Sequence, residues 1–210
     1  NSGFELNKNM QQVPLISFKS MKRFIGIFLS LLISQVAISQ GEVQPKPFVR
    51  KGFTFGLGIG AGTIKISKGF KTQTTFSATL PNIKIGYMLN KRVELLAYLP
   101  GATYKYAKKD RGFEGAILGL QFWEKENWWV MAGTGLTFDA AAFYTVKDPK
   151  KAGFYTGFPA ITFATGLEIY HSKRFALDIQ YRFFFGKSNL PNKFERVGIS
   201  NMLLLGFNWY

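Results

Sequence analysis

From residue 52 to residue 209, hydrophobic positions alternate with small or polar positions. In the first run, Phe53, Phe55 and Leu57 alternate with threonine and glycine. Successive side chains of a β-strand point to opposite faces, so an alternation of period two predicts a strand with one apolar face. Eight runs have this pattern, at residues 52–61, 76–89, 93–99, 115–122, 128–138, 161–170, 175–183 and 197–209. The sequence therefore predicts an all-β protein.

The connections between these runs alternate in length. The long and polar connections are residues 63–73, 100–112, 140–157 and 186–195, and the short ones are residues 90–91, 124–127 and 171–173. If neighbouring strands are antiparallel, all long connections lie at one end of the sheet. Outer-membrane barrels have this asymmetry. Because backbone groups in lipid must all be paired within the protein, we expect a closed eight-stranded antiparallel up-and-down transmembrane β-barrel.

The less apolar set of side chains separates a membrane barrel from a soluble one. In a soluble barrel this set faces water and is about 25–35% charged. Here it is mainly glycine, threonine, alanine, glutamine and tyrosine. Its few mid-strand charges are expected to pair with one another in a narrow lumen, and they are Lys84, Glu94, Glu168, Asp178 and Arg182. The other set is almost free of charge and is expected to face lipid, where a midplane Arg or Lys costs about 2–4 kcal/mol.

The N-terminal region has a different pattern. Lys22 and Arg23 precede an apolar stretch at residues 24–38, which small residues follow. This plan predicts a signal peptide. A transmembrane anchor is the alternative, but about 15 apolar residues are fewer than the roughly 20 that a spanning helix needs. The expected organisation is an upstream segment outside any domain at 1–20, a signal peptide at 21–39, a periplasmic N-terminal segment at 40–50 and the barrel at 51–210.

The composition limits the chemistry available. The 210 residues include no cysteine and one histidine, His171, so disulfides, thiolate catalysis and multi-histidine zinc sites are excluded. We expect no metal and no cofactor. His171 and Ser172 are adjacent in a turn, which does not give an oriented base and nucleophile, so we interpret them as solvated turn residues. The lumen charges could act as acid and base groups or as a proton path, but mutual pairing is the simpler interpretation. We expect a non-enzymatic protein.

Positive charge is in strong excess, with a formal net charge of +15 at pH 7. Many basic residues lie in or beside the long connections, and they include Lys68, Lys71, Lys105, Lys108, Lys109, Arg111, Lys147, Lys150, Lys151, Lys187 and Lys193. We expect these basic loops to be extracellular and to attract the phosphates and carboxylates of lipopolysaccharide. Solvated loop charge without a specific partner is the alternative. Nucleic acid is not expected, because the charge gathers at one end of a barrel.

The pattern as a whole resembles the small outer-membrane β-barrel proteins of the OmpA/OmpX type, particularly those common in Bacteroidetes. The resemblance covers about residues 50–210 and includes a last strand that ends Leu203-Leu204-Leu205-Gly206-Phe207-Asn208-Trp209-Tyr210. It implies export to the outer membrane of a Gram-negative cell envelope. It also implies that the barrel-assembly machinery reads the terminal aromatic residues, here Phe207, Trp209 and Tyr210. The apolar parity falls on Trp209 and Phe207, one residue out of step with Tyr210.

Two functions stay open at this point. The first is a structural or surface-interaction role through the basic extracellular loops. The alternative is a narrow channel or transporter, related to porins, for a small solute or lipid. Eight strands enclose an interior just wide enough for side chains, which favours the first function. The sequence leaves the physiological ligand and the oligomeric state open.

Overall fold

The computed structural model describes residues 48–68, 71–79, 82–106, 109–142 and 153–210. The predictions for residues 1–20 and 21–39, and for most of 40–50, lie outside the described residues. Within the described part of the chain, no helix is both long and apolar enough to cross a membrane.

Ten strands and one short 3-10 turn make up the structure. The strands are β1 (Gly52–Lys68), β2 (Lys71–Ala78), β3 (Asn82–Met88), β4 (Val93–Leu99), β5 (Gly101–Tyr106), β6 (Lys109–Trp123), β7 (Trp128–Ala141), β8 (Tyr155–Ser172), β9 (Phe175–Asn189) and β10 (Glu195–Trp209). The 3-10 turn, η1, spans Pro191–Lys193 and connects β9 to β10.

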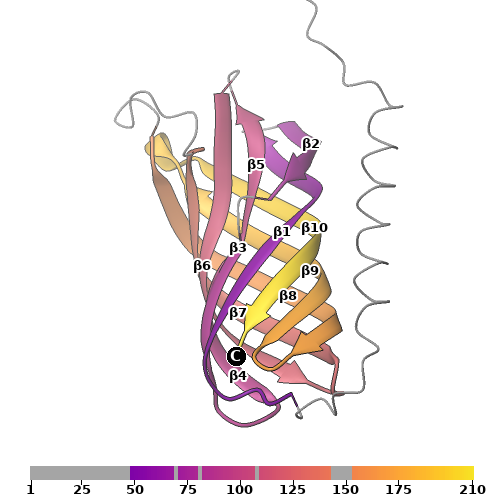
Figure 1. Cartoon of the computed structure of the whole chain (residues 1–210). Coiled ribbons are helices and arrows are strands. Elements are labelled where there is room, and N and C mark those ends of the chain that lie inside the picture. The colour runs from indigo at the N-terminus through magenta and orange to yellow at the C-terminus, as the bar shows by residue number, and fades with distance from the viewer. Residues whose placement is uncertain (1–47, 69–70, 80–81, 107–108, 143–152) are drawn as a thin grey trace, which may run out of the picture. The chain divides into compact units, whose positions relative to one another are not determined.

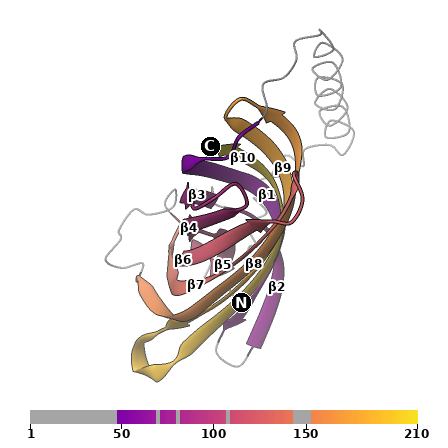
Figure 2. The same ribbon diagram turned by 90° about the horizontal axis from the view of Figure 1, so that it is seen from below.

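The strands form one closed antiparallel ring (Figures 1 and 2). The ring has eight strand positions, which we call walls, because two of the positions are each occupied by two shorter strands. β2 and β3 share a wall, because β1 pairs with β2 along its C-terminal half and with β3 along its N-terminal half. β4 and β5 share another wall, because both pair with β6. β10 pairs with β1, from Phe55 opposite Trp209 to Ile66 opposite Gly198, and closes the ring. The predicted closed eight-stranded barrel is confirmed.

A proline divides the wall formed by β4 and β5. Pro100 has no N–H to donate to the ladder, so the strand is interrupted there. Its carbonyl still accepts a hydrogen bond of 2.8 Å from the Gly115 N–H of β6. The pairing with β6 therefore continues on both sides of the break.

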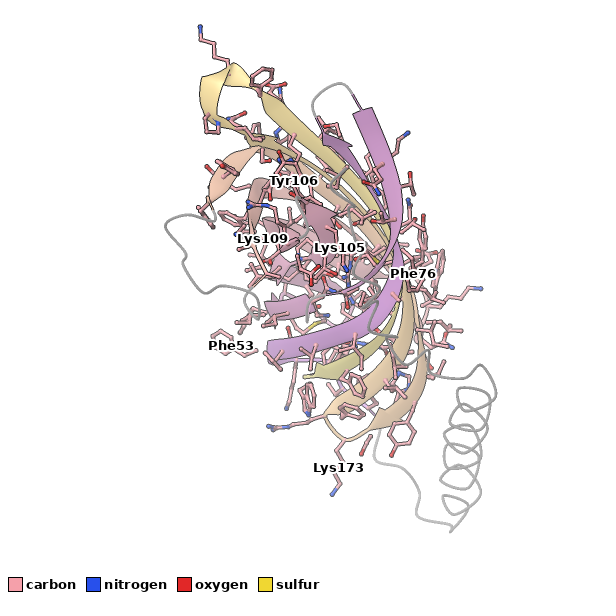
Figure 3. The ribbon with its side chains drawn as sticks, turned by 90° about the horizontal axis from the view of Figure 1, so that it is seen from above. Phe53, Phe76, Lys105, Tyr106, Lys109 and Lys173 are labelled. Carbon is pink, nitrogen blue, oxygen red and sulfur yellow. The ribbon has the colours of Figure 1, made fainter. Side chains whose placement is uncertain are left out.

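The two faces of the sheet have opposite character, as the alternation predicts. Large apolar side chains face outward: Leu118 is 70% exposed and Ile179 46%. The charged side chains of the same strands face inward, and Glu94 and Asp178 are both 0% exposed. In Figure 3, Phe53 and Phe76 point away from the barrel. The exterior is thus apolar and the lumen contains the polar groups, which is the reverse of a soluble barrel.

The long connections are shorter than the sequence predicts, because the strands continue into them. β1 and β2 run as far as Lys68 and Lys71, which are partners in the ladder. β5 and β6 likewise pair up to Tyr106 and Lys109. The prediction of loops at 63–73 and 100–112 is therefore largely wrong. The alternation continues into these segments, since Ile64 is buried. The polar side chains that suggested loops lie on the outer face of extended strands, where they contact water. We call this end of the barrel the hairpin end, and the opposite end, near the C-terminus in Figure 1, the short-turn end.

Candidate functional site

The lumen contains four groups of side chains at different levels. The group near the middle of the lumen is a polar layer. β3 places Lys84 next to Glu94 of β4 and Gln121 of β6. The Lys84 Nζ donates to Glu94 Oε2 at 3.2 Å and to Gln121 Oε1 at 3.1 Å. The Thr54 hydroxyl of β1 donates to Glu94 Oε1. Lys84 and Glu94, two of the five predicted lumen charges, are thus brought together as an ion pair.

Asp178 and Arg182 of β9 lie in the same layer as Lys84 and Glu94. We call these four residues and their hydrogen-bond partners the mid-lumen layer. Among the residues that the structure describes, Asp178 accepts hydrogen bonds from neutral donors only: Gln180 at 2.7 Å, Trp129 at 3.0 Å and Asn208 at 3.0 Å. Arg182 donates through Nη2 to the side-chain carbonyl of Gln180 at 3.0 Å.

Arg182 has no carboxylate partner among the described residues. Its guanidinium instead lies 4.5 Å from the ring centroid of Tyr98, which projects from β4 on the opposite wall. The prediction that all lumen charges pair with one another is therefore wrong for Arg182 and for Asp178. The cause is local: Gln180 and Tyr98 occupy the space around the guanidinium, and Asp178 is already saturated by three donors.

Glu168, the fifth predicted lumen charge, belongs to a separate group at the short-turn end. Its carboxylate pairs with Arg50 and with His171, the latter at 2.6 Å. It also accepts from the Trp123 indole at 3.0 Å and from the Tyr210 hydroxyl at 2.9 Å. We call Glu168, Arg50 and His171 the mouth cluster.

The mouth cluster changes two sequence interpretations. His171 is not a solvated turn residue, because β8 continues to Ser172 and the ring stacks on Phe48 at 4.5 Å between centroids. The sequence pattern did not identify Arg50 as a site residue. The available indication is that a buried carboxylate needs a cation, and Arg50 lies two residues before the start of β1. Burial, reinforced by the charge of Glu168, raises the pKa of the Tyr210 hydroxyl well above its usual value, so this hydroxyl remains a donor.

An apolar layer separates the mid-lumen layer from the hairpin end. It consists of Ile64, Ile66, Phe113 and Phe184, all buried. Phe113 of β6 packs edge-on against Phe184 of β9, with 6.0 Å between ring centroids. A Cβ placed on Gly198 of β10 would lie only 2.3 Å from the Phe113 ring, so this ring reaches the opposite wall and needs the glycine there. Phe113 thus extends across the lumen and packs with the other side chains of this layer.

A second charged group lies at the hairpin end, and we call Arg111, Asp139, Arg196 and Tyr104 the outer cluster. Asp139 of β7 accepts from Arg111 Nε at 2.7 Å, from the Tyr104 hydroxyl at 2.8 Å and from Arg196. Arg196 Nη1 also donates to the Tyr104 oxygen at 2.8 Å. All four residues are buried. The interpretation of Arg111 as a basic loop residue is therefore wrong, because β6 begins before it and turns its side chain inward.

The remaining basic residues of the hairpin end face outward or sit at strand ends. Lys105, Lys109 and Lys193 are exposed, and Lys105 and Lys109 lie on the paired strands β5 and β6 (Figure 3). Lys187 makes an ion pair with Glu195 at 2.5 Å. The side chains of Lys68 and Lys71 and all of Lys108, Lys147, Lys150 and Lys151 lie outside the described part of the structure.

Among the described residues, the mouth cluster does not combine its histidine with a hydroxyl nucleophile. Nucleophilic catalysis needs a hydroxyl or thiol within hydrogen-bonding distance of a base. His171 bonds to Glu168, and among the described residues no serine or threonine hydroxyl bonds to its ring. The described residues also contain no group of three histidine or carboxylate side chains able to hold a metal ion.

The three C-terminal aromatic residues, Phe207, Trp209 and Tyr210, do not all lie on the same face of the barrel wall. Trp209 faces outward and packs against Phe55 and Phe175, with 5.8 and 5.2 Å between ring centroids. Phe207 lies on the same face, close to Phe175 at 6.5 Å. Tyr210 is 6% exposed and lies in the lumen next to Trp123. Only Phe207 and Trp209 therefore present their rings on the outer face.

Solved structures of other proteins have a similar fold. No family model matches the chain, and no curated protein matches it. Among solved structures, Neisserial surface protein A superposes with a TM-score of 0.52 and 18% identity, over 75% of this chain and 96% of that one. Ail of Yersinia pestis, in complex with the heparin analogue sucrose octasulfate, gives a TM-score of 0.48 and 14% identity over 76% of this chain and 100% of that one. The N-terminal β-barrel domain of Pseudomonas aeruginosa OprF gives 0.40 and 16% over 76% and 100%.

These structures are small outer-membrane β-barrels, so the predicted resemblance to that fold is confirmed. The identities are low, and the similarity concerns the fold alone. The narrower resemblance to barrels common in Bacteroidetes stays a prediction.

Proposed function

We propose that this chain is a non-enzymatic integral protein of the Gram-negative outer membrane. The observation that carries the proposal is the closed ring with an apolar exterior and a charged interior, exemplified by exposed Leu118 and Ile179 and buried Glu94 and Asp178. Such a surface is stable in hydrocarbon and not in water, because exposed apolar area is costly in water and the ladders of the closed ring pair the strand backbones with one another. By analogy with other barrels of this kind, the short-turn end faces the periplasm.

We further propose that the hairpin end interacts with anionic groups at the cell surface. Exposed basic side chains there include Lys65, Lys105, Lys109 and Lys193. Phosphates and carboxylates of lipopolysaccharide lie at this level of an outer membrane and would gain Coulomb energy from them. For assembly, Phe207 and Trp209 are the aromatic residues we propose for recognition by the barrel-assembly machinery, because their rings lie on the outer face.

The alternative of a narrow channel or transporter has less support. Phe113 reaches from β6 to Gly198 on the opposite wall, so a solute would have to displace an aromatic ring packed on several strands. We expect the folded barrel to give no steady conductance in planar bilayers. Stable conductance steps of uniform size would favour the channel instead.

Charge reversal tests the surface interaction. Changing Lys65, Lys105, Lys109 and Lys193 together to glutamate should weaken binding of the detergent-folded protein to immobilised lipopolysaccharide at least tenfold at low salt. The wild-type affinity should also fall as salt rises, because exposed charges are screened. The matched control reverses four exposed charges at the short-turn end, Lys91, Arg92, Lys125 and Lys173. An equal loss in both variants, or no loss in either, would contradict a role for the hairpin end.

A further inference from the structure

The mid-lumen layer encloses a small cavity whose lining is rich in hydrogen-bond donors. The space open to the centre of a water molecule is ≈ 20 Å³. This is about what one water or one small ion requires. Among the lining residues are Tyr98, Gln121 and Arg182, which project from three different walls of the barrel.

Each of these three side chains carries polar atoms without a protein partner. Nε and Nη1 of Arg182, Nε2 of Gln121 and the Tyr98 hydroxyl are buried and have no hydrogen-bond partner among the described residues. The three side chains are at most 3% exposed. Buried polar groups in native proteins are almost always paired, and an unpaired one costs about 1–3 kcal/mol, more if it is charged.

The unpaired atoms are all able to donate, and three of the four can only donate. Gln121 has already used its carbonyl oxygen to accept from Lys84, which leaves its amide N–H₂ for the cavity. Arg182 has used Nη2 on Gln180, which leaves Nη1 and Nε. A water would accept bonds from such donors but would also present two hydrogens of its own. A small anion needs donors alone, so it matches this set better.

The charges around the cavity favour the same occupant. Glu94 is engaged by Lys84 and Thr54, and Asp178 by Gln180, Trp129 and Asn208. Neither carboxylate touches the Arg182 guanidinium. A buried cation without a counter-charge is expensive, and an anion in the cavity would supply one.

We infer that the mid-lumen cavity is a binding site for a single small monatomic anion of the halide class, held by Arg182, Gln121 and the Tyr98 hydroxyl. The small volume favours a monatomic ion over phosphate, sulfate and organic anions. The site lies between the apolar layer and the mouth cluster and is distinct from the basic surface of the hairpin end. The bound ion would act as the missing counter-charge of Arg182 and would stabilise the barrel.

Bromide tests this inference directly, because it can be located by anomalous scattering. Crystals of the wild-type barrel grown in sodium bromide should show an anomalous peak within hydrogen-bonding distance of Arg182 and Gln121. The thermal midpoint of the full chain in detergent should rise by about 2–4 °C when sodium gluconate is replaced by sodium chloride or bromide at equal ionic strength. A cavity that holds water only, or bromide only at other places as an adventitious ion, would overturn the inference.

Two variants show whether the thermal effect belongs to this cavity. Gln121→Glu is isosteric and supplies a built-in carboxylate, so it should fold and lose the halide-dependent shift. Tyr98→Phe removes one donor without changing the ring and should require several-fold more halide for the same shift. The matched control, Lys91→Gln, removes an exposed charge at the short-turn end, outside both proposed anion-binding regions, and should keep the full shift. A shift that persists unchanged in Gln121→Glu would overturn the site.

Discussion

The hairpin end and the middle of the lumen both bury arginine, and they hold it in different ways. In the outer cluster, Arg111 and Arg196 share one carboxylate, Asp139. In the mid-lumen layer, Arg182 contacts an amide and an aromatic ring and no carboxylate. The same residue type is therefore tied into a charged network at one level of the barrel and isolated from protein anions at another.

The difference has a consequence for stability. Removing one partner of a buried ion pair leaves an uncompensated charge, which typically costs about 3–5 kcal/mol, whereas replacing a whole buried ion pair by apolar residues of similar volume is often neutral or stabilising, because no charge is left without its partner. Asp139 has two cationic partners, and its loss would leave both arginines buried without a carboxylate. Arg182 has no anionic partner to strand. Substitutions at the two levels should thus have very different effects on the free energy of unfolding.

The largest effect is expected from Asp139→Ala. This change leaves Arg111 and Arg196 buried without their carboxylate and should lower the free energy of unfolding by about 4–5 kcal/mol. Urea unfolding of the barrel folded into lipid vesicles measures it. Lys187→Ala is a suitable control, since it breaks a more exposed pair with Glu195 and should cost at most about 1 kcal/mol. Equal costs for the two substitutions would remove the distinction between buried and exposed pairing at this end.

The sequence contains the information for the outer cluster, although the loop interpretation obscured it. Asp139 continues the inward parity of Trp129 and Met131, and Arg111 and Arg196 lie on the inward parity of their own strands. Extending the period-two pattern past the expected strand ends would have placed all three in the lumen. Which residue meets which was not predictable, because Arg111 and Asp139 are brought together by the register of β6 and β7, and Arg196 comes from the opposite wall.

The fold and the inward position of the mid-lumen charges were predictable for a different reason. A single mid-strand charge facing lipid is so costly that the parity of Glu94, Asp178 and Arg182 fixes their side of the sheet. Their partners depend on how far each long side chain reaches across the lumen, and alternation carries no information about that. The pairing of Glu168 with Arg50 was also not predictable. Arg50 precedes the first strand, so the alternation does not assign its side chain to either face.

A second large effect is expected in the apolar layer between the two levels. Phe113→Ala removes a ring packed on Phe184 and Gly198 and should lower the free energy of unfolding by about 3–4 kcal/mol through lost burial and a new cavity. Gly198→Ala places a methyl group against the same ring. Combined with Phe113→Ala, it should recover part of the loss, because the methyl then fills vacated space. Additive costs in the double variant would contradict the contact between these two positions.

The mouth cluster should give an intermediate effect, because its carboxylate is buried while the Arg50 and His171 side chains are partly accessible to water. Glu168→Gln removes the charge that Arg50 and His171 share and should cost about 2–3 kcal/mol. Vesicle-based urea unfolding again provides the measurement. Arg50→Gln serves as the converse change. If the two substitutions act through one network, the double variant should cost clearly less than the sum of the single variants, and additivity would show that the contacts are independent.

The smallest effect is expected at Arg182, and it sharpens the comparison most. Arg182→Met keeps the length of the side chain, removes a buried charge without stranding a carboxylate, and loses one hydrogen bond to Gln180. In halide-free buffer the free energy of unfolding should change by about 1 kcal/mol or less, in either direction. The measurement is urea unfolding in sodium gluconate, with Asp139→Ala measured in parallel. A loss at Arg182 as large as that at Asp139 would mean that the guanidinium supports the barrel through contacts with protein groups alone, and the contrast between the two levels would fail.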